Sequence, residues 1–145
     1  MFVVDANLLI YAAIRESPHH DRAKRLVQEW GGSSEAWSVT WSIIYEFFGV
    51  STRGSIYARP LSFSDAWSFV QILRMSPSFE ILAETERHPE VIDQLSREYP
   101  QMSGARFHDL HIAAVMREHG ITEIRTADTD FHQFKFLRVT NPLVA

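Results

Sequence analysis

The stretch of sequence that decides the expected fold is MFVVDANLLIYAAI, residues 1–14. Phe2–Val4 is a short apolar run that ends at Asp5. A continuous apolar run with a polar stop is typical of a strand buried in a parallel sheet. Residues 7–14 then predict a short helix, which Ser17-Pro18 ends because the residue before a proline is pushed out of the helical region. The chain therefore opens with the strand–helix unit from which parallel α/β sheets are built.

The same alternation of strand and helix patterns continues along the chain. Apolar spacing predicts further helices over residues 20–30, from about residue 40, and over 65–75, 89–99 and 104–119. Between these helices we expect short strands over residues 36–39, 79–82, 123–126 and 137–140. The expected helix caps and stops are Thr40 or Ser42, Ser64, Gly31-Gly32 and Gly120. We expect one domain over residues 1–145, an α/β protein with a three-layer α/β/α sandwich and a mostly parallel central sheet.

Composition and charge exclude several kinds of site. The chain of 145 residues has no cysteine, which excludes disulfides, thiolate metal sites and a cysteine nucleophile. Its formal net charge is -4, which argues against a non-specific nucleic-acid coat but leaves open a nucleic-acid enzyme with an acidic site. Asp5 and Asn7 interrupt the apolar start, which also lacks the basic residues of a signal peptide. We therefore expect a cytoplasmic protein.

Carboxylates stand where a parallel sheet places its ligands, which is outside the carboxyl ends of the strands. Asp5 ends the first expected strand, and Asp128 and Asp130 follow the fourth. Glu46 and Asp109 interrupt apolar faces of expected helices. Because an isolated buried charge is costly, carboxylates on such faces are either partnered or functional.

Each of these acids also has a purely structural interpretation. Asp5 can cap the helix that follows it, and Asp109 can pair with Arg106 one turn earlier. Either Asp128 or Asp130 can stabilise a turn. The functional interpretation rests on the acids acting together.

Convergence of four acids from separate elements would create strong mutual repulsion. At about 4 Å and an effective dielectric of about 20, each pair of carboxylates costs about 4 kcal/mol. Such a cluster needs protonation or a bound cation, and hard oxygen ligands favour Mg²⁺ or Mn²⁺ over Zn²⁺. Ions held in this way polarise a phosphoryl oxygen and lower the pKa of an attacking water. The expected reaction is metal-dependent hydrolysis of phosphodiester bonds, and the expected catalytic and metal-binding residues are Asp5, Glu46, Asp109 and Asp128.

Four motifs carry a family resemblance: VVDANLLIYA, the glutamate of IIYEFFGV, HDLHIAAVMREHG, and TADTDF followed by LRVTNPL. As an ordered set they resemble the motifs of PIN-domain nucleases, most closely the VapC ribonuclease toxins of toxin–antitoxin pairs. The resemblance implies a Mg²⁺ or Mn²⁺ cofactor, an RNA substrate, a VapB-like antitoxin partner and a homodimer. It places the family's acids on Asp5, Glu46, Asp109 and Asp128, a further metal-supporting acid on Asp130, and positioning residues on Asn7 and Thr126. Residues 53–99 carry no motif of the family.

Two further sets of residues carry weaker expectations. Arg53, Arg59 and Arg106 flank the expected acidic edge and are candidates to hold RNA phosphates, because arginine makes bidentate phosphate contacts. Aromatic side chains at helical spacing are expected in the core or on a dimer surface. Those expected to leave apolar surface for a dimer are Phe47, Phe48, Trp67 and Phe69.

Two other functions stay open from the sequence. A PIN-like module without catalysis would serve as a docking surface for protein or RNA and would look similar. The sequence HDLH, with His108 and His111, suggests an HD-type metal phosphohydrolase with His19 or His20 as further ligands. The predicted strands argue against that enzyme class, since its architecture is helical.

Overall fold

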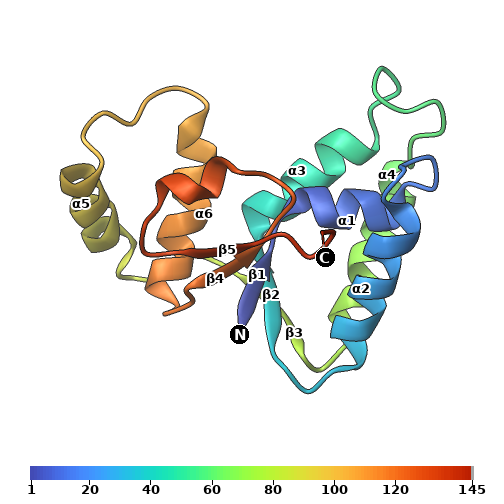
Figure 1. Ribbon diagram of the computed structural model, residues 1–145, viewed down its shortest axis with the longest axis horizontal. Helices are drawn as coiled ribbons and strands as arrows, with labels where there is room; N and C mark the ends of the chain where they lie inside the picture. Colours follow the sequence, from blue (N-terminus) through green and yellow to red (C-terminus); the bar gives the residue numbers. More distant parts are fainter. Residues whose placement is uncertain (145) are drawn as a thin grey trace.

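The structure is a computed structural model that describes residues 1–144, and its centre is a sheet of five strands (Figure 1). Along the chain these are β1 (Phe2–Val4), β2 (Trp37–Thr40), β3 (Phe79–Leu82), β4 (Glu123–Arg125) and β5 (Arg138–Thr140). The strand order is β3-β2-β1-β4-β5, and every neighbouring pair is parallel. The strand order reverses at the central β1. The carboxyl ends of β1 and β4 therefore form the crevice where open α/β sheets bind ligands.

Helices cover both faces of this sheet. In the described residues they are α1 (Ala6–Ala13), α2 (His20–Gly32), α3 (Trp41–Ser51), α4 (Phe63–Arg74), α5 (His88–Glu98), α6 (Arg106–Glu118) and the short 3-10 helix η1 (Asp130–Gln133). Figure 1 shows α5 and α6 on one side of the sheet and α1, α2 and α4 on the other. The predicted three-layer α/β/α sandwich is thus confirmed. None of the helices within residues 1–144 is long and apolar enough to cross a membrane.

The core explains why the first strand is a continuous apolar run. Every residue of β1 and β2 is buried, so both faces of these strands are covered. Trp37 on β2 packs between Trp30 of α2 and Phe79 of β3, with ring centroids 5.7 and 4.7 Å away. Aromatic pairs at such separations add stabilisation beyond the area they bury. This layer joins α2 to the sheet and holds β1 in its central position.

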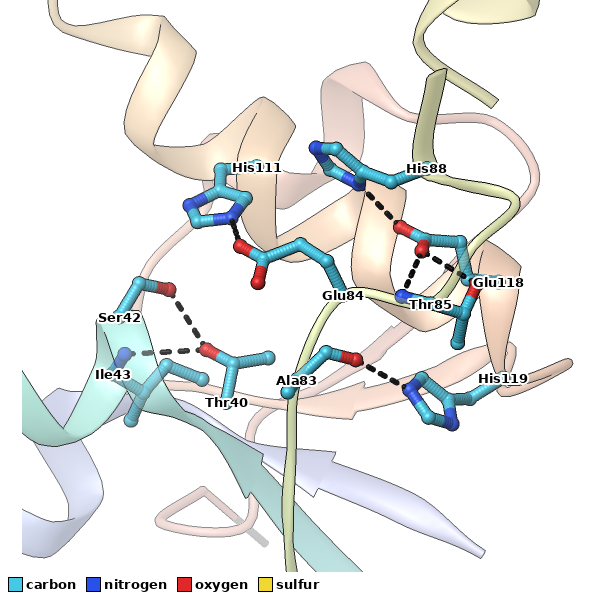
Figure 2. Close-up of polar contacts among 10 residues, drawn as sticks. All are labelled: Thr40, Ser42, Ile43, Ala83, Glu84, Thr85, His88, His111, Glu118 and His119. Carbon is cyan, nitrogen blue, oxygen red and sulfur yellow. Dashed lines mark hydrogen bonds and ion pairs between the residues drawn. The ribbon is translucent and has the colours of Figure 1, made fainter. Parts of the chain in front are cut away.

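Hydrogen bonds at the helix starts decide between the predicted caps. Thr40 caps α3, because its Oγ1 accepts a hydrogen bond from the N–H of Ile43 at 3.2 Å (Figure 2). The predicted Ser64 cap of α4 is wrong. Ser62 is the cap, and its Oγ accepts from the N–H of Asp65 at 3.0 Å. The sequence SFSD offers two serines, and only the first lies one residue before the helix.

One helix boundary at a glycine lies where it was predicted. Two other predicted boundaries differ from the observed ones. Gly120, with φ of +69°, follows α6 as expected. Gly104 has φ of +64°, a left-handed conformation that a helix cannot contain, so α6 begins at Arg106 instead of residue 104. Gly31-Gly32 form the last residues of α2 and do not end it earlier.

The aromatic residues of α3 and α4 divide between the core and the surface. Phe47 is fully buried and stacks on the partly buried Phe69, with ring centroids 5.1 Å apart, so these two do not supply the expected exposed surface. Trp67 does reach the surface, whereas Phe48 is partly buried like Phe69. With two further side chains, Phe48 and Trp67 form a group of neighbouring rings that we call the aromatic patch, made of Tyr45, Phe48, Phe63 and Trp67.

Candidate active site

Asp5 lies at the carboxyl end of the central strand and is only 7% exposed. Its Oδ1 accepts a hydrogen bond from the N–H of Ala6 at 2.8 Å, so Asp5 also caps α1. The structural interpretation of Asp5 as a helix cap is therefore observed. The cap uses one carboxylate oxygen and fixes the direction in which the other points.

Thr126, directly after β4, connects the ends of the two strands. Its hydroxyl donates to Oδ2 of Asp5 at 2.8 Å and accepts from the side-chain amide of Asn7 at 3.1 Å and from the N–H of Asp128 at 3.0 Å. The side-chain oxygen Oδ1 of Asn7 accepts in turn from the backbone N–H of Ala127 at 3.3 Å. Asn7 and Thr126 thus lie between Asp5 and the turn that carries Asp128, and their hydrogen bonds connect the two.

The four predicted acids line one cavity of about 260 Å³ beside these strand ends. They come from four elements: the end of β1, α3, α6 and the turn after β4. Within the part of the chain that the structure describes, no lysine or arginine lines this cavity. Its full lining is Asp5, Asn7, Ile10, Tyr11, Glu46, Val50, Tyr57, Asp109 and Asp128. We call it the acidic cavity.

The electrostatics of the acidic cavity disfavour ionised carboxylates in the absence of a cation. Burial raises the pKa of Asp5 from 3.8 to about 6. Hydrogen bonds from Thr126 and Ala6 oppose this shift, and the charges of Glu46 and Asp109 add to it. The pKa of Asp109 is also raised, first by burial and then by the negative charge of Asp130. A divalent cation bound among these oxygens would relieve both effects.

Glu46 has a partner that the sequence did not indicate. The Nε2 atom of His108 on α6 lies 3.0 Å from Oε2 of Glu46 on α3. This hydrogen bond raises the pKa of His108, although partial burial opposes it. His108 therefore orients one oxygen of Glu46 and links the two helices that carry the second and third acids.

Asp130 lies at the edge of the site and does not line the acidic cavity. It is exposed at the start of η1, and its N–H donates to Oδ1 of Asp128 at 3.1 Å. Its charge nevertheless contributes to the raised pKa of Asp109. The geometry gives Asp130 two effects, on the orientation of Asp128 and on the local potential.

The three predicted RNA-binding arginines lie outside the lining of the acidic cavity. Arg106 does not pair with Asp109, because its guanidinium donates two hydrogen bonds to Oε1 of Gln133, at 3.0 and 2.6 Å. Arg59 lines a different cavity, where its backbone N–H donates to Glu16. Arg53 is exposed in the turn that follows α3. Of the three, Arg106 is on the helix that carries Asp109.

Two tyrosines that were not predicted from the sequence line the acidic cavity. Tyr11 lies four residues after Asn7 on α1, and positions four apart share one helix face, so this spacing could have revealed it. Tyr57 lies in the loop between α3 and α4, where residues have no regular spacing from which its position could be predicted. Burial raises the pKa of Tyr57, with Tyr11 and Glu16 adding to the shift. The hydroxyl groups of both rings can donate hydrogen bonds to a ligand in the acidic cavity.

The histidines do not form the ligand set of an HD-type enzyme. His108 bonds to Glu46, whereas His111 bonds to Glu84 on the segment after β3. The ring of His20 contacts the carbonyl of Tyr11 on α1 at 2.9 Å. The parallel sheet likewise disagrees with the helical architecture of that class.

Comparisons with known proteins agree with this fold. A family model described as "PIN domain" matches residues 2–137. Ribonuclease VapC33 of Mycobacterium tuberculosis is 30% identical over 150 residues, which cover 99% of each chain.

Two solved structures are similar in fold. The crystal structure of Mycobacterium tuberculosis VapC20, a sarcin–ricin loop cleaving toxin, has a TM-score of 0.66 at 21% identity and covers 97% of this chain and 100% of its own. VapBC2 from Rickettsia felis, bound to a DNA fragment from its promoter, has a TM-score of 0.66 at 17% identity and covers 97% of each chain. At such identities the likeness establishes a shared fold.

Proposed function

The chain belongs to the PIN-domain family, and from that premise we propose that it is a VapC-type toxin that hydrolyses RNA phosphodiester bonds. The observation that carries the proposal is the acidic cavity at the carboxyl ends of β1 and β4. Four carboxylates from separate elements converge there without a lysine or arginine in the described lining. A binding module without catalysis would not need this costly arrangement of like charges.

The donor set of the acidic cavity fits Mg²⁺ or Mn²⁺. Its candidate ligands are the carboxylate oxygens of Asp5, Glu46, Asp109 and Asp128, and hard oxygen donors suit these ions. A bound divalent ion would supply charge stabilisation at a phosphoryl oxygen and a lower pKa for a water.

The chain's own residues prepare this site. Thr126 and Ala6 hold the carboxylate of Asp5 through its two oxygens, and His108 holds one oxygen of Glu46. Asp130 supports Asp128 through a backbone hydrogen bond. Preorganised carboxylates lose little conformational freedom when a cation binds, which favours a well-defined site.

The proposal is tested by RNA cleavage with and without EDTA for the wild type and Asp109→Asn. We expect EDTA to abolish cleavage and the substitution to lower its rate by about a hundredfold or more, since both remove electrostatic stabilisation of the transition state. Asp93→Asn is the matched control, because Asp93 is an exposed acid paired with Arg97. Cleavage that persists in EDTA, or that proceeds in Asp109→Asn at the wild-type rate, contradicts the proposal.

The partner in the cell is proposed to be a VapB-like antitoxin. A solved relative of the same fold is a VapBC complex. An acidic cavity suits a basic peptide electrostatically, so an antitoxin tail can place an arginine there. Expression of the toxin alone should arrest growth, and Asp109→Asn should relieve the arrest.

We further propose that the chain forms a homodimer through the aromatic patch. Phe63 and Tyr45 are each 69% exposed, which is unusual for large apolar rings on a monomer surface. Light scattering at micromolar concentration should give the mass of a dimer, and Phe63→Glu should shift it toward the monomer. Ile72→Glu is the control, since Ile72 is equally accessible on α4 but lies outside the patch. A wild-type monomer would exclude this dimer.

A further inference from the structure

Three side chains with metal-binding atoms converge outside the acidic cavity (Figure 2). Glu84 follows β3, His88 is the first residue of α5, and His111 lies in α6. One ligand atom from each lies within 4.8 Å of the other two. Nε2 of His111 is 2.5 Å from Oε1 of Glu84, and the two imidazole rings lie 5.8 Å apart between centroids. No residue of this cluster lines the acidic cavity.

The buried carboxylate of Glu118 orients the imidazole ring of His88. Oε2 of Glu118 lies 2.6 Å from Nδ1 of His88, and Oε1 accepts hydrogen bonds from the N–H and hydroxyl of Thr85 at 2.7 and 2.9 Å. The Glu118 carboxylate is thus held in place by Thr85 and fixes the orientation of the His88 ring through Nδ1. A carboxylate against one ring nitrogen is the arrangement that commonly orients metal-binding histidines.

The donor chemistry differs from that of the acidic cavity. Two imidazole nitrogens and one carboxylate oxygen form a set that suits Zn²⁺ and similar transition metals, in contrast to the all-oxygen set for Mg²⁺. The side chains of His88, His111 and Glu84 are 27%, 39% and 46% exposed, so a water can occupy a fourth position. Without a cation, His111 pairs with Glu84 and His88 pairs with Glu118, whereas a cation would use Glu84 and both imidazoles together.

We propose that Glu84, His88 and His111 form a second metal site, for Zn²⁺ or a similar transition-metal ion, with Glu118 as the orienting carboxylate. An ion at this place joins the segment after β3 to α5 and α6. His111 lies two residues after Asp109, so the same ion braces the helix that carries the third acid of the acidic cavity. The site is independent of whether the acidic cavity cleaves RNA.

The test is titration of the metal-free protein with Co²⁺, followed by visible absorption, in excess Mg²⁺ to occupy the acidic cavity. We expect one Co²⁺ per chain in the wild type, competed by Zn²⁺. Glu84→Gln and His111→Gln should each weaken binding by roughly tenfold or more. These exposed positions are preferable to His88, whose loss would leave Glu118 buried without its partner. His132→Gln is the control, because His132 is an exposed histidine on η1 outside the cluster.

A second measurement separates this site from the acidic cavity. Zn²⁺ should raise the thermal unfolding midpoint of the wild type and of Asp5→Asn, but not of Glu84→Gln, because only a binding-competent native state is stabilised by a ligand. Equal Co²⁺ affinity in the wild type and in Glu84→Gln and His111→Gln would overturn the proposal. So would loss of Co²⁺ binding in Asp5→Asn, which would place the ion in the acidic cavity.

Discussion

At the scale of single residues, Asp5 shows the conflict between stability and function most clearly. It is the most buried of the four acids, and its surroundings include two other carboxylates. Its hydrogen bonds to Thr126 and Ala6 do not offset the cost of burial, because the pKa remains raised at about 6. A carboxylate kept under these conditions destabilises the metal-free protein, which is the usual cost of a preorganised site.

Replacing Asp5 by asparagine tests this conflict through pH. The carboxyl has a pKa of 3.8 in the unfolded chain and about 6 in the folded protein, so between these values the folded state holds a proton that the unfolded state has lost. Stability therefore falls as pH rises through this window, and the full cost, at most about 3 kcal/mol, is present above it. Asparagine carries no such cost.

The measurement is thermal unfolding in EDTA, compared between Asp5→Asn and the wild type. The difference in melting temperature should change in favour of Asp5→Asn as pH rises from below about 4 to neutral. Comparing the difference across pH removes any constant effect of the asparagine amide on packing. A difference that is independent of pH would show that Asp5 titrates at its ordinary value.

Residue-scale expectations could be formed where a local signal existed. Asp5 and Asp128 stand out because they follow predicted strands, whereas Asn7 and Thr126 are expected only from the family resemblance. His108 as the partner of Glu46 was not foreseen, since that contact joins positions 62 apart in the chain. No spacing rule connects residues on two separate helices, and packing alone decides which of their side chains meet.

At the scale of elements, α6 connects more parts of the molecule than any motif indicates. Its His108 reaches α3, its His111 reaches the segment after β3, and its Glu118 reaches the start of α5. All three contacts lie on the helix that also carries Asp109. The orientation of the third acid thus depends on contacts with three other elements, and the sequence shows only that the helix is amphipathic.

The start of α4 gives a direct test of how local hydrogen bonds define an element. Ser62→Ala should destabilise the protein by about 1 kcal/mol, because the N–H of Asp65 loses its side-chain acceptor. Ser64→Ala should change stability by less than about 0.5 kcal/mol, since Ser64 is exposed within the helix. Urea unfolding of the two variants measures both values. Equal effects would mean that the helix start shifts between the two serines.

At the scale of the whole molecule, the net charge of -4 belongs to the protein without metal ions. Several of its acids are gathered in the acidic cavity, where bound cations would neutralise them. Each divalent ion adds two positive charges, so one or two ions would bring the total to about -2 or 0. The charge that argues against a nucleic-acid partner is therefore concentrated at the place where the proposed RNA phosphate must approach.

RNA binding should consequently depend on divalent metal more strongly than on salt. With a short RNA whose linkages resist cleavage, removing Mg²⁺ should weaken binding by roughly tenfold, the equivalent of about 1.4 kcal/mol. The reference is the same protein in monovalent salt of equal ionic strength, because screening alone acts on all exposed charges. Asp128→Asn should reduce this dependence on Mg²⁺, whereas Asp93→Asn removes the same unit of charge outside the cavity and should leave it intact. Binding that is equal in Mg²⁺ and in matched salt would mean that the RNA is held by surface outside the acidic cavity, and the three arginines outside its lining would then be the first positions to test.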